Sequence, residues 1–239
     1  GPTGFHRRLW RAAVGENSLT FTRLSCDGEE GYPGNLLVSV RYTFDDECRL
    51  GIHYQALCDQ DTVINLTNHS YFNLDGEDSE SVEGQHLQIF ADSFAENDAG
   101  CLPTGRIVSL DSEEGAPFDF REPTEIGKRL HEENIHLKNG SGYDHNYLLK
   151  KQPDGLCARA YSRSSGILLE CRTSEPGMQL YTGNFLSTSN IVGKGGKSYA
   201  DRAGFCLETQ HYPNAMEHPE FPSVVLPAGE LYDTTTEYH

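Results

Sequence analysis

The chain has few basic residues, and this shortage narrows the range of its partners. Lysine and arginine together number 19 of 239 residues, whereas aspartate and glutamate number 36, so the formal net charge at pH 7 is −17. A protein with this charge repels the phosphates of nucleic acid and the head groups of anionic membranes. Nucleic acid and membranes are therefore poor candidates as partners.

Long apolar runs and paired cysteine motifs are also missing. No apolar stretch reaches membrane-spanning length, and no signal peptide is recognisable. The seven cysteines are scattered without a Cys-x-x-Cys pair, which is typical of reduced thiols in the cytoplasm rather than of disulfides or a zinc site. The ten histidines show no metal-site spacing, and the loop motifs of nucleotide-binding proteins and serine hydrolases are absent. The sequence thus predicts a cytoplasmic protein and gives no support for a metal or a nucleotide.

Helical periodicity is scarce, and strand patterns dominate the chain. Alternating apolar and polar residues identify candidate strands at 38–44, 50–56, 65–74, 85–91, 156–162, 167–173, 178–182, 204–210 and 222–226. Only the segment around Ile126 and Leu130 is typical of a short helix. Many short strands with almost no helix predict an all-β chain, folded in one domain as an antiparallel sandwich or barrel.

The candidate strand at residues 65–74, NLTNHSYFNL, has an unusual composition for a buried strand. Its apolar face would anchor it in the core and consists of Leu66, Phe72 and Leu74. Its other face consists of Thr67, His69, Tyr71 and Asn73. A row of hydrogen-bonding groups of this kind needs water or a polar ligand. The pattern therefore predicts that this face lines a binding site.

Polar residues in three other segments could share that site. Asp144 follows a glycine-rich turn, Gln179 follows Pro176-Gly177, and Glu208 shares a strand face with Gln210. Each residue alone has a simpler structural explanation, such as a turn aspartate or a water-facing glutamate. A histidine combined with carboxylates on a β scaffold nevertheless suits acid–base catalysis on a neutral, hydroxyl-rich molecule. A sugar ring could then stack on the aromatic side chains Tyr71, Tyr143 and Tyr181.

Taken together and in this order, these segments resemble those of the aldose 1-epimerase family, whose members are also called galactose mutarotases. The resemblance rests on NLTNHSYFNL (65–74), GYDHN (142–146), PGMQLYTGNF (176–185) and FCLETQHYPNA (205–215), supported by DGEEGYPG (27–34) and LPAGELY (226–232). It extends over essentially the whole chain. It implies one large antiparallel β-sandwich domain over residues 1–239, of the galactose mutarotase-like supersandwich kind.

The resemblance also implies a function and a set of site residues. It implies an isomerase of hexose metabolism that interconverts the α and β anomers of aldohexoses such as galactose and glucose, without a metal or other cofactor. His69 matches the general acid and Glu208 the general base of the family. Residues that bind the sugar are matched or adjoined by Ser70, Tyr71, Asp144 and Gln179. A reference pKa of about 4.3 predicts that Glu208 is readily ionised near neutral pH. The preferred sugar and the oligomeric state are left open.

The start of the chain departs from the family pattern. Members of the family carry several strands before the segment that matches Gly1–His6, and those strands supply an arginine and a histidine to the sugar site. We expect this chain to lack them, together with part of the sandwich.

Several alternatives therefore stay open. The chain could be a catalytically impaired fragment, a sugar-binding protein of the same fold, or a fragment completed by a partner chain. An epimerase of phosphorylated hexoses would need a basic phosphate pocket, for which the acidic composition gives no support.

Overall fold

Strands make up most of the ordered structure of this chain. The computed structural model describes residues 3–150, 152–189 and 191–239. Within these ranges the chain has one α-helix, α1 (Ile135–Gly140), and several single turns of 3-10 helix. These turns are η1 (Phe5–Arg7), η2 (Glu29–Gly31), η3 (Ala116–Phe118), η4 (Ile126–Lys128), η5 (Leu186–Ser189), η6 (Lys194–Gly196) and η7 (Ala215–Glu217). The prediction of an all-β chain is confirmed.

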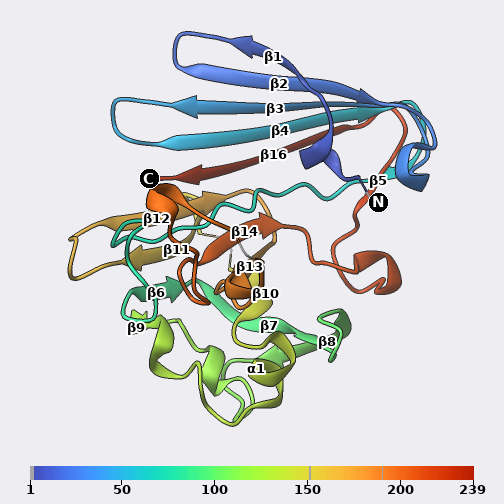
Figure 1. Cartoon of the computed structure of the whole chain (residues 1–239). Helices are drawn as coiled ribbons and strands as arrows, with labels where there is room; N and C mark the ends of the chain where they lie inside the picture. Colours follow the sequence, from blue (N-terminus) through green and yellow to red (C-terminus); the bar gives the residue numbers. More distant parts are fainter. Residues whose placement is uncertain (1–2, 151, 190) are drawn as a thin grey trace.

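The larger of the sheets has nine antiparallel strands. Its order is β1 (Arg11–Val14), β2 (Ser18–Ser25), β3 (Leu36–Phe44), β4 (Leu50–Cys58), β16 (Leu231–Tyr238), β12 (Leu168–Thr173), β11 (Leu156–Tyr161), β6 (His86–Ile89) and β9 (Thr124–Glu125). The C-terminal strand β16 thus joins the N-terminal meander β1–β4 to the second half of the sheet (Figure 1).

A second sheet of five antiparallel strands lies below β16 in the view of Figure 1. Its order is β14 (Cys206–Gln210), β13 (Gly177–Tyr181), β10 (Asp144–Leu149), β7 (Ala91–Asn97) and β8 (Pro103–Ser109). A small two-stranded ladder pairs β5 (Thr62–Val63) with β15 (Val225–Leu226). No helix in the described ranges is long and apolar enough to cross a membrane.

One face of the five-stranded sheet forms part of the core. Its strand register aligns a row of buried residues that consists of Thr209, Met178, Tyr147, Phe94 and Val108. This face contacts β16, because the Tyr238 hydroxyl donates to the Leu207 carbonyl at 2.6 Å. Since successive residues of a strand point to opposite faces, the residues between these core positions lie on the other face of the sheet.

The segment 65–74 lies outside the regular strands, so the prediction that it forms a strand is wrong. Its only bridge among the described residues is the pair Phe72–Phe205, whose two N–H to carbonyl distances are 2.7 and 2.9 Å. Side-chain hydrogen bonds take the place of the missing backbone pairing. Asn65 bonds to the backbone of His211, and Asn68 donates to the Tyr238 hydroxyl. The predicted apolar anchors do pack inward: Leu74 is buried, and Leu66 and Phe72 lie half-buried against the core.

The helix prediction also needs correction. The segment around Ile126 forms strand β9 and the 3-10 turn η4, although Ile126 and Leu130 are both buried as an apolar pair. The one α-helix of the described chain, α1, was not predicted. The Asn134 side chain caps it by accepting from the backbone N–H groups of His136 and Leu137 at 2.8 and 3.3 Å. Six residues are too few to produce a visible helical periodicity.

We expect Tyr238→Phe to lower the free energy of unfolding by about 1–3 kcal/mol. The Tyr238 hydroxyl joins the Asn68 side chain to the Leu207 carbonyl, and the change leaves both groups without their partner. Urea unfolding followed by circular dichroism measures the difference. Tyr161→Phe on β11 is the matched control, because Tyr161 is 40% exposed and should tolerate the change. Equal stability of the two variants would contradict the role of this hydroxyl.

Candidate active site

The strand register gathers the candidate site residues on the outer face of the five-stranded sheet. Two rows cross β10, β13 and β14: Asp144, Tyr181 and Cys206 form the first, and Asn146, Gln179 and Glu208 form the second. Side chains directly opposite one another on neighbouring antiparallel strands are in contact range. Asp144, Gln179 and Glu208 are therefore brought together, as the sequence analysis expected.

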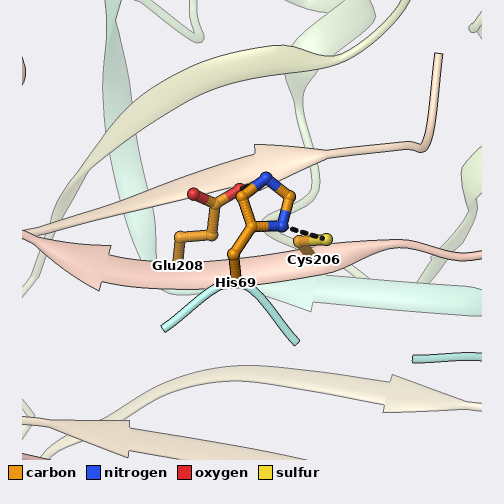
Figure 2. Close-up of side chains that lie close together, drawn as sticks. All are labelled: His69, Cys206 and Glu208. Carbon is orange, nitrogen blue, oxygen red and sulfur yellow. Dashed lines mark hydrogen bonds and ion pairs between the residues drawn. The ribbon is translucent and has the colours of Figure 1, made fainter. Parts of the chain in front are cut away.

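His69 reaches the same face from the segment 65–74. Its Nε2 atom lies 3.5 Å from Oε1 of Glu208, and its Nδ1 atom lies 3.4 Å from Sγ of Cys206 (Figure 2). The imidazole ring lies 5.1 and 5.8 Å from the ring centres of Tyr71 and Tyr181. The His69 side chain is 51% exposed, whereas that of Glu208 is 11% exposed. A solvent-accessible histidine thus faces a buried carboxylate.

Hydrogen bonds from two asparagines that precede His69 hold its segment against β14. Asn65 donates to the carbonyl of His211 at 2.9 Å and accepts from its backbone N–H at 3.0 Å. Asn68 donates to the Tyr238 hydroxyl at 3.0 Å, and that hydroxyl bonds to β14 itself. Because these contacts come four residues and one residue before His69, they fix the position of its backbone relative to Glu208.

A buried carboxylate supports this arrangement from the core side. Glu175 accepts a hydrogen bond from the Tyr232 hydroxyl at 3.1 Å and lies 2.6 Å from Nδ1 of His211. The Tyr232 hydroxyl also accepts from the backbone N–H of Leu66 at 3.4 Å. The network therefore connects the end of β14 with the start of the segment that carries His69.

Burial and a neighbouring charge change the protonation of Glu208. Its pKa is raised to about 8, first because burial disfavours the charged carboxylate and second because of the negative charge of Asp144. The expectation that Glu208 is readily ionised at neutral pH is therefore wrong for the ligand-free site. Burial also raises the pKa of Asp144, although the hydrogen bond from Gln179 and the charge of His69 act in the opposite direction.

Gln179 has an unused hydrogen-bond acceptor at the centre of the site. Its Nε2 group donates to Oδ1 of Asp144 at 2.7 Å. Its Oε1 atom is buried and has no hydrogen-bond partner among the described residues. Since buried polar atoms are almost always paired in folded proteins, this oxygen is suited to accept a hydrogen bond from a bound hydroxyl group.

The other predicted sugar contacts, Tyr71, Ser70 and Tyr143, lie in different surroundings. Tyr71 is 46% exposed, and its ring lies beside those of His69 and Tyr181. Ser70 is exposed, and no hydrogen bond in the described chain connects its hydroxyl to this cluster. Tyr143 is fully buried and donates to the Pro117 carbonyl at 2.8 Å, so the expectation that it stacks on a sugar is wrong.

Sequence reasoning missed three residues that the structure places at or below this site. Cys206 stands two positions before Glu208, and period-two spacing alone would have put it on the same strand face. Asn65 and Glu175 act through hydrogen bonds to His211. No local pattern indicates them, because each contact joins segments that are far apart in the sequence.

Comparison with known proteins agrees with the fold and with the quoted motifs. The two-sheet architecture places the chain among the β-sandwich proteins. A family model described as aldose 1-epimerase matches residues 3–239. The chain belongs to the aldose 1-epimerase family.

The individual relatives bear this out. A galactose mutarotase from Bos taurus is 46% identical over 237 residues, and an aldose 1-epimerase from Escherichia coli K12 is 37% identical over 243 residues. The solved structure of a GalM/aldose epimerase homologue from C. elegans superimposes with a TM-score of 0.88 at 31% identity. The match covers all of this chain and 70% of that one.

Each alignment covers nearly all of this chain but only part of the relative. The alignment with the Bos taurus protein takes in 99% of this chain but 66% of that protein. With the Escherichia coli protein the shares are 100% and 68%. The chain thus spans about two thirds of the length of the curated relatives that it matches.

We expect direct titration of Glu208 by carbon NMR of its side-chain carboxyl to give a midpoint near 8. Asp144→Asn should move this midpoint to lower pH, because the variant removes a negative charge that disfavours ionisation. Asp233→Asn on β16 is the control for the change in total charge, since Asp233 lies on an exposed strand position beside His53. A midpoint that stays unchanged in Asp144→Asn would contradict the assigned cause.

Proposed function

We propose that this chain catalyses anomer interconversion of free aldohexoses, with His69 and Glu208 as the acid–base pair. The observation that carries the proposal is the 3.5 Å approach of His69 Nε2 to Glu208 Oε1 beside the Asp144–Gln179 pair. Membership of the aldose 1-epimerase family supports it. Relatives named galactose mutarotase support galactose as one substrate.

The proposed reaction opens the sugar ring by two proton transfers. The Glu208 carboxylate takes the proton of the C1 hydroxyl, and the electrons of that O–H bond form the C1 carbonyl. The bond between C1 and the ring oxygen breaks, and the ring oxygen takes a proton from Nε2 of His69. The C1 hydroxyl oxygen and the ring oxygen are both bonded to C1. The Glu208 and His69 side chains, 3.5 Å apart, can therefore each reach one of these oxygens in the same site.

Ring closure reverses the roles of the two residues. Rotation about the C1–C2 bond exposes the other face of the aldehyde. His69 then takes back the proton of the C5 hydroxyl as its oxygen attacks C1, and Glu208 returns its proton to the former carbonyl oxygen. The product is the other anomer, and both side chains end in the protonation states in which they began.

The neighbouring residues suit the binding of a neutral polyol. The buried Oε1 atom of Gln179 is free to accept from a sugar hydroxyl, and Asp144 offers a second acceptor beside it. Tyr71 and Tyr181 present aromatic rings next to His69, with ring centres 6.1 Å apart. We assign these four residues and the adjoining Ser70 to substrate binding, which determines the position of C1 between the acid and the base.

We also propose a cytoplasmic location and a single domain over residues 1–239. All seven cysteines are free, which suits a reducing compartment. One buried cluster includes residues of both large sheets, such as Tyr54 and Tyr147, and this supports a single folding unit.

Polarimetry of freshly dissolved α-D-galactose tests the proposed activity, after subtraction of the spontaneous rate. We expect the protein to accelerate the change in rotation, and His69→Ala and Glu208→Gln each to lower the catalysed rate by about 10²–10⁴-fold. His53→Ala is a matched control, because His53 also lies beside a carboxylate, Asp233, at 3.0 Å but on the large sheet. We expect it to keep the full rate.

Two outcomes would contradict the assignment. A folded wild-type protein without any rate above background would contradict the activity, and calorimetric binding of galactose would then identify a sugar-binding protein. A catalysed rate that survives in His69→Ala and Glu208→Gln would contradict the assigned residues.

The pH dependence of kcat/KM provides an independent check. Glu208 must lose its proton to act as a base, and its pKa is raised to about 8 in the free site. We therefore expect kcat/KM to show a rising limb with a midpoint near 8, because this parameter reports the free enzyme. A rising limb centred near the ordinary glutamate value would contradict the raised pKa of Glu208.

A further inference from the structure

Cys206 occupies the acid–base centre but has no role in the proposed proton transfers. It shares the outer face of β14 with Glu208, two residues away, and its sulfur lies beside the His69 ring (Figure 2). Sγ of Cys206, one ring nitrogen of His69 and one carboxylate oxygen of Glu208 all lie within 4.8 Å of one another. A thiol, an imidazole and a carboxylate therefore converge on one point.

We propose that His69, Cys206 and Glu208 form a binding site for a zinc ion, and that the bound ion blocks the acid–base centre. Sulfur, imidazole nitrogen and carboxylate oxygen are the three protein ligand types of zinc. Zinc-to-sulfur and zinc-to-nitrogen bonds of about 2.3 and 2.0 Å in a tetrahedron separate the two ligand atoms by roughly 3.5 Å. The observed distance from Sγ of Cys206 to Nδ1 of His69 is 3.4 Å.

The third ligand needs only a small adjustment. The 3.5 Å contact of Oε1 of Glu208 is to Nε2 of His69, the other nitrogen of the ring, so the ring or the carboxylate must rotate before both ligands reach one ion. The three ligand atoms already lie within 4.8 Å of one another. The His69 ring is half-exposed and can rotate to present one nitrogen to the ion. Its exposure also leaves a fourth coordination position open to water.

The charge of the site favours a divalent cation. The carboxylate side chains of Asp144 and Glu208 lie on the same sheet face as the Cys206 thiol. Their negative charges attract a cation. Formation of the zinc–sulfur bond releases the thiol proton to solvent, and any proton held by Glu208 leaves in the same way.

The ion and the sugar would exclude each other. A Glu208 oxygen bonded to zinc cannot accept the proton of the C1 hydroxyl, and the ion with its water ligand occupies the space between His69 and Glu208 where C1 would bind. Only this blocking effect rests on the proposed function, whereas ion binding depends on the three side chains alone. A soft-ligand ion such as zinc is favoured over magnesium, which prefers oxygen ligands and keeps its water.

Titration of the reduced protein with Co²⁺ in the absence of sugar tests the site directly. Thiolate ligation of Co²⁺ produces a charge-transfer band in the near ultraviolet, and we expect it to saturate at one equivalent and to disappear when Zn²⁺ is added. Cys206→Ser should abolish the band, and His69→Ala should weaken binding at least about tenfold. Cys48→Ser is the matched control, because Cys48 is an exposed free thiol whose loss should leave the band unchanged.

Several results would overturn the proposal. These are a wild-type protein without the band, a band that persists in Cys206→Ser or is lost in Cys48→Ser, and unchanged affinity in His69→Ala. The His69 variant decides the question if Cys206→Ser fails to fold, because the His69 side chain is half-exposed.

Polarimetry with one equivalent of Zn²⁺ tests the blocking effect separately. We expect Zn²⁺ to abolish the catalysed rate, a chelator to restore it, and Mg²⁺ to have no effect. Tight Co²⁺ binding with an unchanged rate under Zn²⁺ would overturn the blocking effect but not the site. Absence of any catalysed rate would count against the proposed function and leave the spectroscopic result standing.

Discussion

The site depends on the burial of the Glu208 carboxylate on β14, the edge strand of the five-stranded sheet. Glu208 lies on β14, and the residues on either side of it, Leu207 and Thr209, belong to the core. Removing a carboxylate from water is unfavourable and raises its pKa. The packing of the opposite strand face offsets this cost. The same strand thus contributes to stability on one face and holds a reactive group on the other.

The edge of β14 would ordinarily pair with another strand, but here it meets an irregular segment. Asparagine side chains at 65 and 68 provide hydrogen bonds that a strand would make with its backbone. One backbone bridge, at Phe72, is enough to align the segment. As a result, His69 turns its ring across the strand edge to Glu208 instead of following the alternation of a ladder.

The composition of this centre has two chemical consequences. A histidine beside a carboxylate of raised pKa suits the exchange of protons with a sugar. A thiol at 3.4 Å from the same histidine adds a soft ligand, so the groups that move protons can also hold a metal ion. Proton transfer needs a free Glu208 oxygen and space for the sugar beside His69, and a bound ion occupies both. Cysteine at position 206 therefore connects the proposed catalysis with the metal content of the surroundings.

The sequence by itself determined the all-β class, the family, strands β3, β4, β6 and β11–β14, and the identity of His69, Asp144, Gln179 and Glu208 as candidates. It did not predict β10 and β16, the middle strands of the two large sheets. The alternation of apolar and polar residues can be read from neighbouring positions, and the family motifs can be recognised from their order along the chain. The tertiary structure decided that 65–74 is not a strand and that Tyr143 belongs to the core. It also decided that Cys206 joins the site and that Glu208 holds its proton near neutral pH. These outcomes depend on long-range contacts and burial, because a pKa and a hydrogen-bond partner are set by neighbours in space rather than in sequence.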